Sequence, residues 1–317
     1  MTPVVAHESW FTDARPGFDW AFALDVATLL LVGAAVAFAV AWRVIGRRLP
    51  RPELTILEPL GALAPWIPRL LAIHAGVSLL AQAANQTYLA PSLDLPATPF
   101  GAALAIAEGA LGVWLISGYR VRTAAIVVVV AGPLGMASYG VVPILERMDL
   151  LAIALFLTQL SPGPDRWSAA EVDPGVVARA TAALRVLVGG ALVVLAFTEK
   201  LARPDLALAF LDRFPAFNLM QTLGLDVSDL AFIRVAGAIE LLLGLLIISG
   251  TAPQLVVIAA GIPFNATLFF LGSEELIGHL PVYGTMLVLL VYGSNRQLAP
   301  VIDRFPRLVT VYPAAGL

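Results

Sequence analysis

The stretch IAEGALGVWLISG, from Ile106 to Gly118, is echoed later in the chain by AIELLLGLLIISG, from Ala238 to Gly250. In each stretch one glutamate, Glu108 or Glu240, stands in apolar sequence and is followed at the same spacing by a glycine and then by Ser-Gly. The match indicates an internal duplication. A carboxyl at the centre of a membrane helix costs about 2.5–3.5 kcal/mol on insertion scales. Two such groups at equivalent positions therefore require a functional or structural explanation.

The composition is that of a membrane protein. Of the 317 residues, 59% are hydrophobic and 13% are charged, whereas soluble domains carry about 25% charged residues. The chain has no cysteine, which excludes disulfides, thiolate-held iron–sulfur clusters and cysteine nucleophiles. The net charge of -3, with basic residues in short clusters, gives no indication of nucleic-acid binding. Lys200 is the only lysine beside many arginines, which is typical of a prokaryotic gene rich in G and C.

Nine apolar segments are long enough to cross a bilayer. They are residues 20–42, 66–86, 99–118, 122–141, 147–161, 181–200, 229–249, 252–271 and 279–294. Backbone groups in lipid must be hydrogen-bonded within their own segment, so we expect every span to be a helix. The sequence therefore predicts an all-α integral membrane protein with about nine transmembrane helices.

The distribution of arginine predicts the orientation in the membrane. Arginines cluster in alternate loops and in the C-terminal tail, and such loops are usually cytoplasmic. The residues concerned are Arg43, Arg47, Arg48, Arg51, Arg120, Arg122, Arg166, Arg179, Arg296, Arg304 and Arg307. We expect a multi-pass protein of the prokaryotic cytoplasmic membrane, with its N-terminus outside and its C-terminus in the cytoplasm. The amphipathic segment 204–224 falls on the outer side, where we expect it to lie at the interface or re-enter the bundle.

The duplication and the spans together predict the domain organisation. Residues 1–50 form an outer N-terminal segment and the first helix, 51–175 a first four-helix unit with its linker, and 176–317 a second four-helix unit with a cytoplasmic tail. The linker SPGPDRWSAAEVDPG, at 161–175, is polar and rich in proline and glycine. An even number of spans separates the two copies, so they form a parallel repeat.

Several short motifs resemble the DoxX family of small four-helix membrane proteins. Leu-Arg at 184–185 lies in a helix that ends in FTEKL at 197–201, the next helix carries Glu240, and the first unit closes with SPGPDRWS at 161–168. The chain is similar to two fused copies of that unit with an added N-terminal helix, over residues from about 66 to 297. The resemblance implies redox chemistry beside the membrane, since one branch of the family is linked to thiosulfate:quinone oxidoreduction and others to oxidoreductase assemblies.

The two copies differ at the positions that carry the resemblance. Ala-Ala-Asn at 83–85 stands near where the second copy has Glu199 and Lys200. The second copy ends in GSNRQL at 293–298 and lacks the Trp-Ser exit of the first. At most one complete family-like site is therefore expected.

Five residues are candidate catalytic groups: Glu240, Lys200, Glu199, Glu108 and Asp149. Carboxyls buried in a bundle are candidate acid/base groups, and they serve equally well as hydrogen-bond acceptors that lock helices together. Lys200 could pair with Glu199 or Glu240, or hold an anionic group such as a quinone oxygen. The alternative is an ordinary interfacial lysine whose ammonium reaches the headgroups.

Each unit is expected to begin its fourth helix with a titratable residue, Glu146 in the first and His279 in the second. Asp149 lies one turn from Glu146, so we expect a cluster of titratable groups near the outer surface. His279 and His7 are candidate ligands of copper or zinc, since histidine is a common metal ligand. The alternative to a metal site is structural: His279 is then a residue at the start of a helix, hydrogen-bonded at the headgroup boundary, and His7 is part of an ordered N-terminal segment.

His74 lies in mid-span, in LLAIHAGVSLL at 70–80. Haem b would need a second axial ligand at similar depth, and the sequence offers none, so we favour a buried histidine bonded to Glu108 or Asn265. His74 and Asn265 are the candidate cofactor-binding residues. Quinone is the leading cofactor, with copper, zinc or haem as alternatives.

Three functions fit these residues. The leading hypothesis is a quinone-linked membrane redox component whose site combines Glu240, Lys200, Glu199 and His279, with carboxylates relaying protons in a polar pocket open toward the outer leaflet. The second is a small-solute transporter or channel with Glu108 and Glu240 as paired gates. The third is a non-catalytic assembly subunit. Expected partners are membrane lipid, quinone and other membrane or redox subunits, and small residues on the helix faces permit homo-oligomers.

Overall fold

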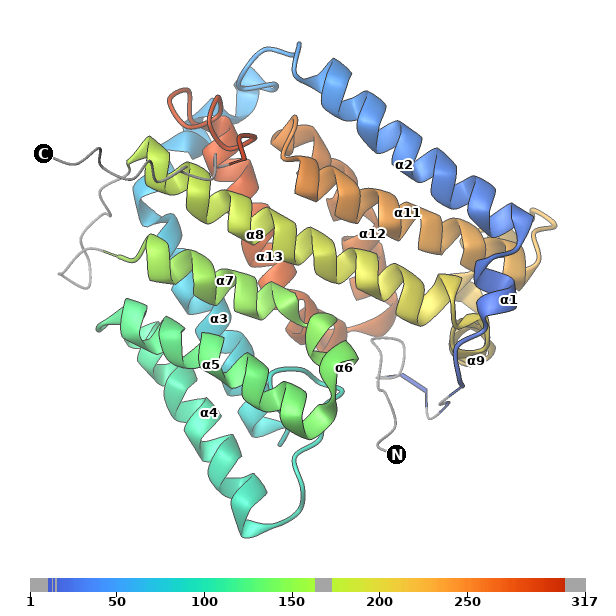
Figure 1. The fold of residues 1–317 in the computed structure, drawn as a ribbon, viewed down its shortest axis with the longest axis horizontal. Coiled ribbons are helices and arrows are strands. Elements are labelled where there is room, and N and C mark those ends of the chain that lie inside the picture. Colours follow the sequence, from blue (N-terminus) through green and yellow to red (C-terminus); the bar gives the residue numbers. More distant parts are fainter. Residues whose placement is uncertain (1–10, 13, 15, 163–172, 306–317) are drawn as a thin grey trace, which may run out of the picture.

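The computed structural model describes residues 11, 12, 14, 16–162 and 173–305, and these form helices without any β-sheet (Figure 1). The helices are α1 (Trp20–Ala23), α2 (Val26–Gly46), η2 (Thr55–Trp66), α3 (Ile67–Ala84), α4 (Pro99–Ser117), α5 (Val121–Tyr139), α6 (Val141–Leu145), α7 (Met148–Gln159), α8 (Pro174–Leu195), η3 (Ala196–Leu201), α9 (Pro204–Arg213), η4 (Pro215–Phe217), α10 (Leu219–Thr222), α11 (Asp229–Ser249), α12 (Pro253–Leu271) and α13 (Ser273–Ser294). The predicted all-helical membrane fold is confirmed.

Eight helical segments within the described residues are long and apolar enough to cross a membrane. The fifth expected span is instead α7, a helix of 12 residues. At about 1.5 Å per residue, a helix of that length is far shorter than a hydrocarbon core of about 30 Å. The described part of the chain thus has eight long helices and, in place of the fifth of about nine expected spans, the short apolar helix α7.

Two helix starts differ from the sequence prediction. One is set by local capping, and the other by an interruption of the helix between α1 and α2. Helix α8 begins at Pro174, where the Asp173 side chain accepts a hydrogen bond of 2.7 Å from the Val176 N–H. Asp173 supplies an N-cap and Pro174 suits the first helical turn. At the N-terminal end, α1 is separated from α2 by Leu24 and Asp25, so the first long helix starts later than expected.

The helices form two groups with corresponding neighbours. Helices α3, α4, α5 and α7 are called the first unit, and α8, α11, α12 and α13 the second unit; within each, successive helices pack on one another. Between the units, α7 packs against α8 while α13 packs against α3. Helix α2 lies outside both groups, along α11, at the edge of the molecule (Figure 1).

The same glycine contact holds the first two helices of each unit together. A Cβ placed on Gly112 would lie 2.7 Å from the carbonyl oxygen of Gly76, and a Cβ on Gly244 would lie 2.7 Å from that of Gly189. Backbones approach this closely only where both helices carry small residues. The equivalence of the sequence around Glu108 and Glu240 therefore extends to the packing of the helices that carry them.

An arginine closes the end of the second helix in each unit. Helix α4 ends at Gly118 (φ 76°) and α11 at Gly250 (φ 62°), and both glycines are in the left-handed region. Arg69 donates a hydrogen bond of 3.2 Å to a last-turn carbonyl of α4, and Arg185 one of 2.9 Å to a last-turn carbonyl of α11. Each guanidinium thus donates to the carbonyl groups at the end of its neighbouring helix, where the regular hydrogen-bond pattern of the helix stops.

The arginine-rich segments meet at one end of the molecule. Arg43 and Arg185 both stack on the Phe305 ring, each with its guanidinium carbon 5.1 Å from the ring centroid. Arg51 forms an ion pair of 2.9 Å with Glu53 in the first loop. Helices α1 and α9 lie at the opposite end (Figure 1).

Candidate functional site

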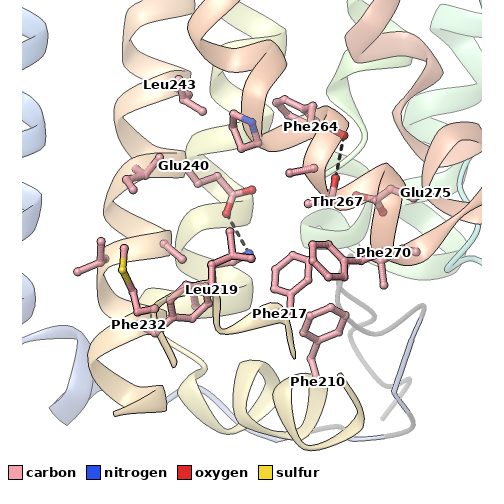
Figure 2. Close-up of a pocket in the computed structure, with 18 of the residues that line it drawn as sticks. Phe210, Phe217, Leu219, Phe232, Glu240, Leu243, Phe264, Thr267, Phe270 and Glu275 are labelled. Carbon is pink, nitrogen blue, oxygen red and sulfur yellow. Dashed lines mark hydrogen bonds and ion pairs between the residues drawn. The ribbon is translucent and has the colours of Figure 1, made fainter. Parts of the chain in front are cut away.

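The second unit contains a pocket of about 450 Å³ between α11, α12 and the short helices after η3. Its wall is mostly apolar and aromatic (Figure 2), and four ionisable side chains also line it. The aromatic lining residues are Phe210, Phe217, Phe232, Phe264 and Phe270, and the ionisable ones are Lys200, Glu240, Glu275 and His279. A pocket of this size and lining suits a small, mainly apolar molecule with one polar group.

The segment between η3 and α11 covers one end of the pocket. Within it, Phe210 packs at 5.0 Å (ring centroids) against Phe217, and both rings line the pocket. Phe11 also packs on this segment, with its ring centroid 6.1 Å from that of Phe210 and 6.0 Å from that of Phe214. The amphipathic sequence at 204–224 thus forms a cover of short helices over the bundle end and not a further span.

A π-helix places the two charged residues at the end of the first helix of the second unit. Residues 196–201 form η3, and the Ala202 N–H donates to the carbonyl of Phe197, five residues earlier, at 2.9 Å. A π-helical turn carries one residue more than an α-helical turn and is often found at functional sites. Here it keeps Glu199 fully buried while Lys200 reaches the pocket.

Lys200 pairs with both of its expected acidic partners. Its ammonium nitrogen lies 3.1 Å from Oε2 of Glu240 and 3.5 Å from Oε2 of Glu199. Only 16% of the Lys200 side chain and 22% of that of Glu240 are exposed. The ammonium is therefore held between two carboxylates and does not extend to the surface as an ordinary interfacial lysine would.

His279 and Glu275 form a second polar group on the pocket wall. Nδ1 of His279 lies 3.2 Å from Oε1 of Glu275, and its ring packs edge-on against Phe264 with centroids 4.9 Å apart. Both residues are buried. Figure 2 shows Glu275 across the pocket from Glu240, so the ionisable groups stand on two sides of an apolar space.

Behind the pocket, charged residues of the first unit meet those of the second. Glu146 interacts electrostatically with Glu199, Arg147 and Arg203, while Asp149 interacts with Arg147 and with His279. All of these side chains are buried. Burial, and next the negative charge of Glu199, raise the pKa of Glu146 to about 7.

The structure therefore brings together five of the residues selected from the sequence. They are Glu240, Lys200, Glu199, Asp149 and His279. The first two and His279 line the pocket directly, whereas Glu199 and Asp149 lie behind it among buried charges.

Glu108 lies apart from this pocket, in the first unit. It is buried, and its Oε1 accepts a hydrogen bond of 2.9 Å from the N–H of Leu89. Leu89 has a positive φ of 58°, a conformation that L-residues rarely adopt. Glu108 thus holds a strained loop closed over the end of the first unit. Its counterpart in the second unit, Glu240, instead faces a pocket.

The prediction that His74 bonds to Glu108 or Asn265 is wrong. His74 Nδ1 lies 2.9 Å from the carbonyl oxygen of Leu70, and the Asn265 amide donates at 2.7 Å to the carbonyl of Gly261, so each bonds one turn back in its own helix. Asn265 is exposed on α12. Neither lines the pocket, so the geometry gives no support to either as a cofactor-binding residue.

The expected metal site falls only partly within the described chain. His7 lies outside the described residues. In the part of the chain that the structure describes, no group of three or more histidine, aspartate or glutamate side chains is arranged to hold a metal ion.

Sequence reasoning missed the two arginines of the buried cluster and the aromatic cover of the pocket. Arg147 directly follows Glu146, and Arg203 lies three residues after Lys200, each beside an apolar segment. That closeness to a candidate charge is the signal that could have marked them. The four phenylalanines between 210 and 232 were the signal for the cover.

Comparison of the chain with known protein families, with curated proteins and with solved structures finds no match. The geometry of the pocket and the residues around it is therefore the basis on which its function is proposed.

Proposed function

We propose that this protein binds a lipophilic, quinone-type molecule in the pocket of the second unit and takes part in membrane redox chemistry with it. The observation that carries the proposal is the Lys200–Glu240 ion pair, at 3.1 Å, on the wall of an otherwise apolar, aromatic-lined pocket of about 450 Å³. This ion pair gives a ligand a polar anchor, while the aromatic rings accommodate a planar apolar body.

The residues present fit the polar end of a quinone. The Lys200 ammonium is a donor with no acceptor capacity, and a carbonyl oxygen is an acceptor. Glu240 lies within ion-pair distance of the same ammonium, so a carboxylate is present to take up or release a proton beside the bound oxygen. A quinone, when bound, supplies the electron-accepting chemistry, and the side chains hold it and provide the proton.

The pocket opens sideways through a lipid-facing surface. Large apolar side chains that line it are also exposed on the outside of the molecule, namely Leu219, Met220, Val235, Ile239 and Phe270. Exposed apolar side chains on membrane helices face hydrocarbon, so a ligand dissolved in the bilayer reaches the pocket without crossing water. The expectation of a polar pocket is corrected: polar groups are confined to Lys200, Glu240, Glu275 and His279 in an apolar wall.

The arginine distribution supports an orientation for this site. The arginine-rich end of the molecule lies opposite the pocket-covering helices, and the positive-inside rule assigns that end to the cytoplasm. The pocket then lies in the outer half of a prokaryotic cytoplasmic membrane. Lys200 and Glu240 are also residues on which the resemblance to the DoxX family rests, and the redox association of that family points the same way.

The structure supports the other two hypotheses less well. A transporter with Glu108 and Glu240 as paired gates would need both carboxyls on one pathway, and Glu108 is bonded to a loop N–H outside the pocket. A role as a subunit of a larger redox assembly is compatible with quinone binding, and co-purification from native membranes distinguishes a component of such an assembly from a protein that acts alone.

The test is quinone binding by the full chain in lipid nanodiscs, with a short-chain benzoquinone and a short-chain naphthoquinone as probes. Lys200→Met is expected to weaken binding at least about tenfold, equivalent to about 1.4 kcal/mol, because the ligand loses its cationic donor. Arg122→Met is the matched control, since it removes a cation from the exposed arginine-rich end of α5 and should leave affinity unchanged.

Two results would overturn the proposal. One is an absence of saturable binding together with a quinone-free organic extract of the protein purified from its native membrane. The other is equal affinity in the wild type, Lys200→Met and Arg122→Met, which would show that binding does not use the pocket.

A further inference from the structure

The buried charged residues on and behind this side of the pocket wall do not balance one another. Among the residues that the structure describes here, four carboxyls accompany two arginines and one histidine: Glu146, Asp149, Glu199, Glu275, Arg147, Arg203 and His279, none more than 7% exposed. The neighbouring Lys200 is matched by Glu240. If every carboxyl were ionised, a net negative charge would be buried in a medium of low dielectric constant, which is strongly unfavourable. A proton bound to one of these carboxyls reduces that charge.

Glu146 is the member whose surroundings favour the neutral form most plainly. It lies between α6 and α7, outside the long spans, and only 1% of it is exposed. Neither of its carboxyl oxygens has a hydrogen-bond partner among the described residues. The Thr198 hydroxyl faces it from η3 without reaching hydrogen-bonding geometry. A buried carboxylate in this position would lack the donors that normally stabilise its charge.

Charged groups of both signs surround Glu146. Glu199 faces it from η3 and repels its negative form, while Arg147 beside it in the chain and Arg203 between η3 and α9 attract that form. Both protonation states are thus attainable, because the arginines stabilise the carboxylate that remains when the proton leaves.

We propose that Glu146 stores a proton and exchanges it with the pocket through Glu199. The O–H bond of Glu146 breaks as one forms at the Glu199 carboxylate, so the proton moves to a group 3.5 Å from Lys200, whose other partner, Glu240, lines the pocket. The negative charge left on Glu146 lies between Arg147 and Arg203. The destination of the proton rests on the proposed function, whereas its storage on Glu146 stands on the cluster alone.

The surroundings of Glu146 also set the sign of the pH dependence. The pKa of Glu146 is raised from its ordinary value of 4.5 to about 7, so the folded protein holds this proton more tightly than the unfolded chain does. The stabilisation is fully present below pH 4.5 and is lost as the pH rises through about 7. Glu146→Gln, which is neutral at every pH, removes this loss.

The experiment uses the full chain, without quinone, as wild type and Glu146→Gln. Infrared difference spectra across a pH step from mildly acidic to mildly basic are expected to show the C=O stretch of a protonated carboxyl in the wild type and its loss in the variant. The apparent melting temperature of the wild type is expected to fall by a few degrees over the same range, and that of Glu146→Gln to fall less. Glu58→Gln is the control, since Glu58 is a partly exposed partner of Arg296 at the arginine-rich end.

An unchanged carboxyl band and an unchanged slope of melting temperature with pH in Glu146→Gln would overturn the proposal. If that variant does not fold, Glu146→Asp replaces it, and its carboxyl band is expected to shift in frequency and in midpoint pH. An identical band in Glu146→Asp would then count against Glu146. Because these measurements need no quinone, their failure is distinguishable from failure of the binding proposed for the pocket.

Discussion

Glu108 in the first unit and Glu240 in the second stand four residues before Gly112 and Gly244, the glycines of the two equivalent helix crossings. Glu108 accepts a hydrogen bond from a loop N–H, while Glu240 forms an ion pair with Lys200 beside a pocket. The carboxyl position is the same in both units, so the segment after the first helix of each unit decides the role of the carboxyl.

The connection after the first helix differs between the units. In the first, α3 ends at Ala84 and a loop at 85–98 closes over Glu108. In the second, η3 continues the helix and leads into the short helices α9, η4 and α10. Counted from the glycine crossings at Gly76 and Gly189, the counterpart of Lys200 is Thr87, slightly later in the chain than the segment 83–85 expected from the sequence. The Thr87 hydroxyl donates at 2.7 Å to the side-chain oxygen of Gln82, so the first unit places no cation there.

The largest expected effect tests whether the two glycine crossings are equally essential. Gly244→Val and Gly112→Val should each destabilise the protein by at least about 3 kcal/mol, because a Cβ at either site would meet the facing backbone oxygen at 2.7 Å. Unfolding in mixed detergent micelles measures the loss. Gly33→Ala in α2 is the control, since a Cβ there meets nothing within 4 Å, and it should gain about 0.5–1 kcal/mol or stay neutral. If only one of the two valine variants lost stability, the two helix crossings would not be equivalent.

A smaller effect tests the structural role of Glu108. Glu108→Leu should lower stability by about 1–2 kcal/mol, because the Leu89 N–H loses its acceptor within a buried loop. Glu108→Gln keeps a side-chain oxygen and should restore most of that stability. The same detergent unfolding assay compares the two variants, and equal stability of Leu and Gln at this position would show that the hydrogen bond does not hold the loop.

The smallest expected effect tests the chemical role of Glu240 against its counterpart. Glu240→Gln should weaken quinone binding about three- to tenfold, equivalent to about 0.7–1.4 kcal/mol, since Lys200 loses one of its two carboxylate partners and is less well positioned. Glu108→Gln should leave affinity unchanged. Binding of a short-chain quinone in nanodiscs is the measurement, and equal losses in the two variants would mean that the units share one site.

Much of the fold was predictable because it depends on local composition. Apolar runs of sufficient length identify membrane helices, and the matched spacing around Glu108 and Glu240 marks the equivalent crossings in the sequence alone. Span ends were less predictable, since α8 starts where Asp173 and Pro174 cap it and not where hydrophobicity rises. The shortness of α7 agrees with the sequence, since Glu146 precedes the expected segment 147–161 and Ser161 and Pro162 end it.

The candidate site was predictable only in part. Lys200, Glu199 and Glu240 could be grouped because two are adjacent and the third lies in a matched motif. The partners of His74 and Asn265 could not, because a side chain that bonds to its own helix leaves no trace in residue spacing. The meeting of Glu146 with Glu199 depends on packing between α7 and α8, which no spacing in the chain encodes.

The π-helix at 196–201 has a consequence for how easily this site could arise or vanish in evolution. A π-helical turn differs from an α-helical one by a single residue. Deletion of one codon within this segment would return it to regular α-helical hydrogen bonding and change the direction of the side chains within it, because the wider turn accommodates one extra residue. The glutamate and lysine would then face other neighbours. The loss of one codon, the smallest deletion that keeps the reading frame, is thus enough to turn this charged site into an ordinary membrane helix.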